Sequence, residues 1–129
     1  MKKTTIIIIL SLLVLLSLAG KTYADSRVRS DISDNVKKYN ELLIKSSKEL
    51  KENGKENKEF ISDINNFIDK CNSLKTSKNE KDLLCKLMTS TLDYLEMINA
   101  KKEGNSDLYT KTFSRFQEDS DKLSNYFKK

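Results

Sequence analysis

The stretch SKNEKDLLCKLMTSTLDYLEMINAKK, residues 77–102, decides the fold of this 129-residue chain. It opens with Ser77-Lys78-Asn79-Glu80, which has the spacing of a capping box: the serine oxygen accepts a backbone N–H and the glutamate reaches back to the serine N–H. It contains no glycine or proline, and it closes just before Gly104, a residue type that readily adopts the left-handed conformation that ends helices. The stretch therefore predicts one long helix over residues 78–102.

The apolar residues of this helix cover more of its circumference than one buried face requires. On a helical wheel they spread over roughly 220°. We expect a central helix that packs against both of its neighbours. The alternative is that its edge at Leu83, Tyr94 and Met97 meets a partner protein. Ile44 lies off the apolar stripe of the first helix, and we expect a lone exposed apolar residue there, with contact to a partner as the alternative. The remaining polar strip consists of Asp82, Lys86, Thr89, Asp93 and Glu96.

Helical spacing of apolar residues recurs on both sides of this stretch, and it breaks at Gly54 and Gly104. Short connections between such segments make consecutive helices antiparallel neighbours. The chain is therefore predicted to be all-α, an antiparallel up-and-down four-helix bundle after a cleaved N-terminal signal peptide. The bundle is expected to occupy residues 25–129, with helices near 26–52, 57–74, 78–102 and 106–127.

Residues 1–24 have the order of a secretory signal peptide. Lysines 2 and 3 give a positive start, Ile6 to Ala19 is apolar, and Thr22-Tyr23-Ala24 ends in a small residue, as signal peptidase requires. We expect cleavage after Ala24, with Ala19 as a second candidate. The apolar segment is shorter than the roughly 20 residues that span a bilayer, and an uncleaved anchor is the alternative.

Leu18-Ala19-Gly20 resembles the lipobox of bacterial lipoproteins, in which the next residue is a cysteine that receives the lipid. Here Lys21 occupies that position and has no thiol. We therefore expect an exported protein without lipid, periplasmic or extracellular, with association to the cell envelope left open.

Cys71 and Cys85 are the two cysteines of the chain. An even pair in a small exported domain usually forms a disulfide, and we expect a bond that joins the second and third helices. Counted from the turn, Cys85 is farther along its helix, an axial offset of roughly 5 Å. Two free buried thiols are the alternative, and the C-x-x-C spacing of redox catalysts is absent.

Side chains for catalysis or cofactor binding are scarce. The chain has no histidine, so we expect no metal, haem or other cofactor. No serine has a histidine base and there is no phosphate-binding glycine loop, so we expect no enzyme. Asp119 is the one acid near an apolar stripe, and we expect partial exposure or a salt bridge there rather than proton transfer.

The charge balance argues against nucleic-acid binding. The full chain carries +5, but removal of the leader takes away three lysines and leaves about +2. Lysines and acidic residues alternate along the rest of the chain, which is typical of solvated helix surfaces. The aromatic residues of the fourth helix fall on its inward face, and we expect core packing for Tyr109, Phe113, Phe116, Tyr126 and Phe127.

These observations predict a small exported, non-enzymatic binding protein of the bacterial cell envelope or exterior. Secreted inhibitors, immunity or exclusion factors and adaptors have this general character, and the partner is expected to be another protein of unknown identity. The alternative is a membrane-surface module, held by an uncleaved leader or by its basic ends. Those basic residues are Arg27, Arg29, Lys128 and Lys129.

Overall fold

The computed structural model describes residues 22–23 and 28–128, with only the backbone described at 22–23. The predicted signal peptide apart from those two residues, the expected cleavage after Ala24, and the basic residues Arg27 and Lys129 lie outside the described residues.

The described part of the chain is mostly helical, which confirms the all-α class. Two short strands, β1 and β2, pair in parallel, with Thr22 opposite Thr76 and Tyr23 opposite Ser77. The elements in chain order are β1 Thr22–Tyr23, α2 Ser30–Asn53, α3 Ile61–Asn72, β2 Thr76–Ser77, α4 Lys78–Lys102 and α5 Ser106–Phe127.

Local signals set the starts of α4 and α5, as predicted, and the end of α2. Ser77 and Glu80 form both hydrogen bonds of a capping box at the start of α4. Asn105 caps α5 by accepting the backbone N–H of Leu108. Gly54 ends α2 with φ 66°, the left-handed conformation that residues other than glycine adopt at a cost.

The first two helices are shorter than predicted at their starts. Helix α2 begins at Ser30 instead of 26, because Arg29 is extended and donates its backbone N–H to the Glu80 carboxylate. Helix α3 begins at Ile61 instead of 57, because the backbone of Asn57 is bound by the Tyr94 side chain. Tertiary contacts therefore override helical spacing at both positions.

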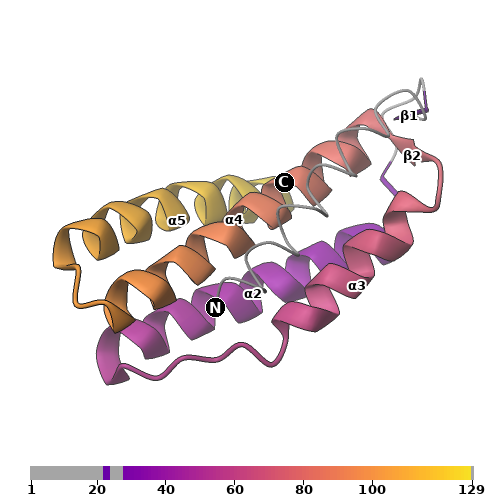
Figure 1. The fold of residues 1–129 in the computed structure, drawn as a ribbon. Helices are drawn as coiled ribbons and strands as arrows, with labels where there is room; N and C mark the ends of the chain where they lie inside the picture. The colour runs from indigo at the N-terminus through magenta and orange to yellow at the C-terminus, as the bar shows by residue number, and fades with distance from the viewer. Residues whose placement is uncertain (1–21, 24–27, 129) are drawn as a thin grey trace.

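Helix α4 runs through the middle of the structure (Figure 1). Helix α5 lies beside it, and α2 and α3 lie below it in that view. Arg29 bonds Glu80 at the start of α2 and α4, while the Lys101 ammonium donates to the Leu50 carbonyl (2.7 Å) near the end of both helices. These two contacts, one near each end, fix how α2 and α4 are aligned along their lengths.

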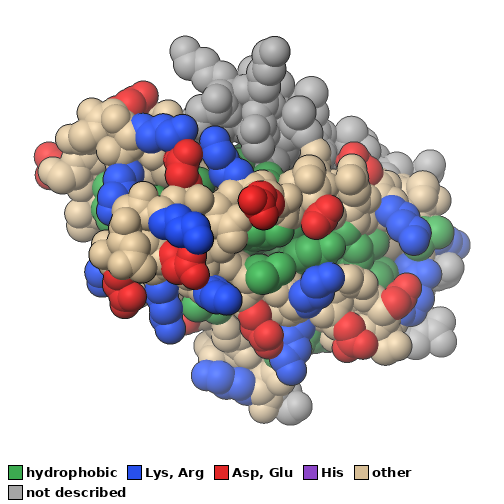
Figure 2. Space-filling model, turned by 90° about the horizontal axis from the view of Figure 1, so that it is seen from below, with side chains coloured by type: hydrophobic (Ala, Val, Ile, Leu, Met, Phe, Trp, Pro, Cys, Tyr) green, Lys and Arg blue, Asp and Glu red, His purple; other side chains and the backbone are tan. Residues whose placement is uncertain are grey.

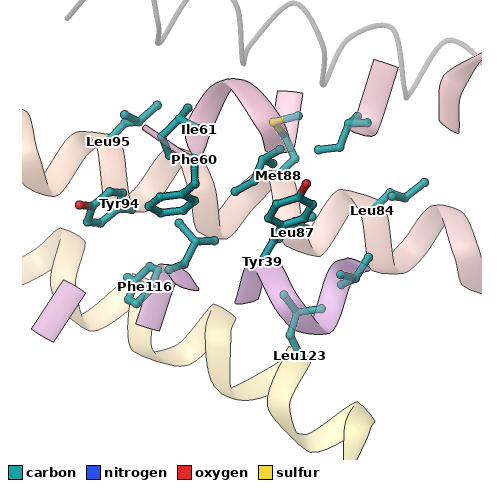
Figure 3. Close-up of a cluster of buried hydrophobic side chains, with 14 of the residues drawn as sticks. Tyr39, Phe60, Ile61, Leu84, Leu87, Met88, Tyr94, Leu95, Phe116 and Leu123 are labelled. Atoms are coloured by element: carbon teal, nitrogen blue, oxygen red, sulfur yellow. The ribbon is translucent and has the colours of Figure 1, made fainter. Parts of the chain in front are cut away.

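The core consists of one cluster of apolar side chains that surrounds α4 (Figure 3). The Phe60 ring lies 6.2 Å from the Tyr94 ring, and Tyr39 of α2 lies 5.7 Å from Phe67 of α3, measured between ring centroids. Helix α4 thus packs on several sides, as expected for a central helix. Its fully buried apolar residues are Leu83, Leu84, Leu87, Met88, Tyr94, Leu95, Met97, Ile98 and Ala100.

Candidate functional site

The edge of α4 that was a candidate contact surface is part of the core. Leu83 is 1 % exposed, and Tyr94 and Met97 are 0 % exposed. The burial of these three residues agrees with the expected central helix and not with the alternative of an exposed edge. The reason is that the rest of the fold covers α4 on more sides than the two helices next to it in the sequence would cover alone.

Tyr94 shows how a polar group is accommodated at this buried position. Its hydroxyl accepts a hydrogen bond from the Asn57 N–H (3.0 Å) and donates one to the Asn57 carbonyl (2.9 Å). Burial raises the pKa of this hydroxyl, although the bond with Asn57 opposes the shift. Tyr94 therefore fixes the loop between α2 and α3, and it presents no surface to a partner.

The two cysteines are not bonded to each other, so the predicted disulfide is corrected to two free thiols. Cys71 is buried and Cys85 is half-buried. They lie in different surroundings: the charged groups that act on Cys71 include Asp31 and Glu80, whereas those that act on Cys85 lie on its own helix, such as Asp82. Burial raises the pKa of Cys71 to about 11.

The face formed by α2 and α3 carries a band of hydrophobic side chains between charged ones. Figure 2, seen from below relative to Figure 1, shows this band with Lys, Arg, Asp and Glu side chains on either side. Half-buried apolar residues on these helices include Leu42 and Ile44 of α2 and Phe67 of α3, all packed against the core. Ile44 is thus neither core nor an isolated exposed residue.

The aromatic residues of α5 are less covered than the sequence predicted. Phe116 is buried, but the other four rings are only half-buried. Tyr109 and Phe113 stack with an interplanar angle of 4°. The ammonium of Lys51 lies 4.9 Å from the centre of the Phe113 ring, and that of Lys101 lies 5.3 Å from the Tyr109 ring. These two rings are thus partly shielded by lysines of neighbouring helices.

Four charged side chains meet between α4 and α5. Asp93 of α4 is 5 % exposed, and its Oδ1 lies 3.9 Å from Nε of Arg115 on α5. Arg115 also pairs closely with Glu96. Burial, followed by the hydrogen bond and the charge of Asp119, raises the pKa of Asp93 to about 8. Asp119 is half-buried, as expected, but its proximity to the buried Asp93 carboxyl was not predicted, because Asp93 belongs to the polar strip of its helix.

Within residues 28–128, no group of three or more cysteine, aspartate or glutamate side chains is placed to hold a metal ion. Among the described helices, none combines the length and the apolar character needed to cross a bilayer.

Comparison of the chain with protein-family models, with curated proteins and with solved structures finds no match. The class that the fold defines is a mostly helical protein of the bundle kind with an apolar core around α4.

Proposed function

We propose that the chain is a small exported, non-enzymatic binding protein of the bacterial cell envelope or exterior. In this proposal an antiparallel up-and-down four-helix bundle acts by contact with another protein, as an inhibitor, an immunity or exclusion factor, or an adaptor. The observation that carries the proposal is the hydrophobic band between charged side chains on the α2–α3 face (Figure 2). Apolar patches with polar rims are typical of protein–protein contact surfaces.

The buried polar side chains support a non-enzymatic role, because several of them have structural partners. Glu80 completes a helix cap, and Tyr94 binds the Asn57 backbone. The Thr91 and Thr112 hydroxyls donate to the carbonyls of Leu87 and Leu108 on their own helices. Groups engaged in this way are not poised to act on a substrate.

The proposed contact region lies on α2 and α3, with Leu42 and Phe67 as its candidate residues. Both are half-buried, so each keeps apolar area that a partner would remove from water. Aromatic side chains at such positions commonly carry a large share of binding energy.

The membrane-surface alternative has less support from the described residues. Arg29, one of its four basic residues, is engaged by Glu80 and donates to the Lys75 carbonyl at 3.0 Å. Lys128 is exposed.

Site-specific photo-crosslinking in the exporting cells tests the proposal. A benzophenone amino acid replaces Phe67, and the control places it at Glu118 of α5, whose side chain is 71 % exposed. We expect one discrete protein adduct from position 67 and none from position 118. The Leu42→Gln variant is expected to lower the adduct yield several-fold, whereas Glu41→Gln on the same helix leaves it unchanged.

Other outcomes contradict the proposal. Equal adducts from both positions would show unspecific contact. Adducts with lipid alone, together with salt-sensitive pelleting on anionic vesicles, would favour the membrane-surface module.

A further inference from the structure

Asp93 is an acid in a place that disfavours its charge. It lies on α4, it is 5 % exposed, and its Oδ2 is buried without a hydrogen-bond partner among the described residues. A buried carboxylate without such partners is costly, whereas the protonated acid can donate a hydrogen bond of its own.

The group that meets Asp93 across the interface is another acid. The Asp119 carboxyl of α5 lies close enough to raise the pKa of Asp93, as a hydrogen-bonding neighbour and through its charge. Two carboxyl groups form a hydrogen bond only when one of them carries a proton, because ionised carboxylates are acceptors only. A hydrogen bond between Asp93 and Asp119 therefore requires one proton.

The other charged groups around Asp93 do not remove the need for this proton. Arg115 of α5 lies 3.9 Å from Asp93, beyond hydrogen-bond distance, and its guanidinium is paired closely with Glu96. Glu96, from the same helix as Asp93, adds a further negative charge. Two acidic side chains, Asp119 and Glu96, and one guanidinium, that of Arg115, thus act on Asp93 at the α4–α5 contact.

We propose that Asp93 and Asp119 form a pH-sensitive contact between α4 and α5, closed by one shared proton and loosened when solvent base removes it. Loss of the proton leaves two carboxylates facing each other in a largely buried interface, and like charges at short range repel. This inference does not depend on the proposed binding function.

The sign of the expected pH dependence follows from linkage. The pKa of Asp93 is raised in the folded protein from an ordinary value of 3.8 to about 8. The folded protein therefore keeps a proton that the unfolded chain has lost, and stability falls as the pH rises between these two values. For one retained proton, the unfolding equilibrium constant grows about tenfold per pH unit within this window.

Chemical unfolding between pH 4 and pH 9 tests the proposal with three variants of the protein. We expect Asp93→Asn to remove most of the fall in stability that the wild type shows across this range, and Asp119→Asn to reduce it. Asp121→Asn, an exposed position on α5, serves as the control and should keep the wild-type pH profile. Equal profiles for the wild type and Asp93→Asn would overturn the proposal.

Two direct measurements separate a shared proton from a general loss of packing. Carbon-13 NMR of the aspartate carboxyls should show one resonance that titrates several pH units above the others. Hydrogen exchange, corrected for the chemical effect of pH, should become faster near residues 90–96 and 114–120 at alkaline pH in the wild type only. Ordinary titration of all aspartates, or unchanged exchange in these segments, would also contradict the proposal.

Discussion

The Tyr94 hydroxyl binds both backbone groups of Asn57, accepting from its N–H at 3.0 Å and donating to its carbonyl at 2.9 Å. This relationship joins the middle of α4 to the loop between α2 and α3. It explains why α3 begins at Ile61, and it explains how the polar tip of a tyrosine fits into the core.

Tyr94→Phe should destabilise the fold by about 1–3 kcal/mol, because it leaves two backbone groups of Asn57 without their partner. Urea unfolding measures the change. Tyr126→Phe is the control, since Tyr126 is half-buried, and it should alter stability by less than about 0.5 kcal/mol. Equal effects in the two variants would mean that the Tyr94 hydroxyl contributes little.

Glu80→Gln should lower the stability of the fold by about 2 kcal/mol at neutral pH, which is typical for the loss of hydrogen bonds to a charged group. Glu80 is 1 % exposed and accepts from the Arg29 Nε at 2.9 Å. Lys78→Gln, at an exposed position in the same first turn of α4, is the matched control and should be nearly neutral.

The cost of Glu80→Gln should also depend on pH. Burial alone would raise the pKa of Glu80, but hydrogen bonds from Arg29 and Ser77 outweigh burial and hold this pKa below its ordinary value of 4.5. The stability that Glu80 contributes is therefore present above pH 4.5 and is lost as the pH falls through the lower, folded-state pKa. Unfolding curves of the two proteins should converge in acid, and a constant difference down to pH 2 would contradict this.

Titration of the denatured, unreduced protein should find two thiols, because neither cysteine is bonded. In the folded protein Cys85 should react with a maleimide before Cys71. Cys71 is buried, and its raised pKa leaves only about one thiolate per thousand molecules at pH 8. Single variants Cys71→Ser and Cys85→Ser assign the two rates, and the absence of any titratable thiol would restore the disulfide.

Phe116→Ala should cost about 3–5 kcal/mol, as expected for a fully buried ring, whereas Phe113→Ala should cost markedly less. Phe116 is 1 % exposed, and Phe113 is half-buried beneath Lys51. Thermal or urea unfolding of the two variants compares these positions on one helix. A similar loss in both would show that the aromatic face of α5 is as deeply packed as its sequence pattern suggested.

The sequence predicted the elements whose signals are local. The capping box at Ser77 and the break at Gly104 are contained within a few residues, and α4 has the predicted bounds. The start of α3 was missed because residues 57–60 fit helical spacing but are held as a loop by Tyr94, 37 positions later.

The candidate site was less accessible to sequence analysis for the same reason. A helical wheel places Asp93 on a polar strip and Asp119 at the edge of an apolar stripe. It does not show that these two residues come close to each other between α4 and α5. Similarly, the wheel shows that Leu83, Tyr94 and Met97 exceed one face of a helix, and it does not show what lies against them.

By itself, the sequence determined the all-α class, the ends of α4 and α5, and the apolar stripes, because hydrophobic spacing and caps act within one helix. Only the tertiary structure decided that the α4 edge is buried, that Cys71 and Cys85 remain apart, and that two aspartates share an interface. These outcomes depend on how the helices are rotated and offset against one another. That arrangement is set by packing of the whole core and by contacts between distant residues, such as Arg29 with Glu80 and Tyr94 with Asn57.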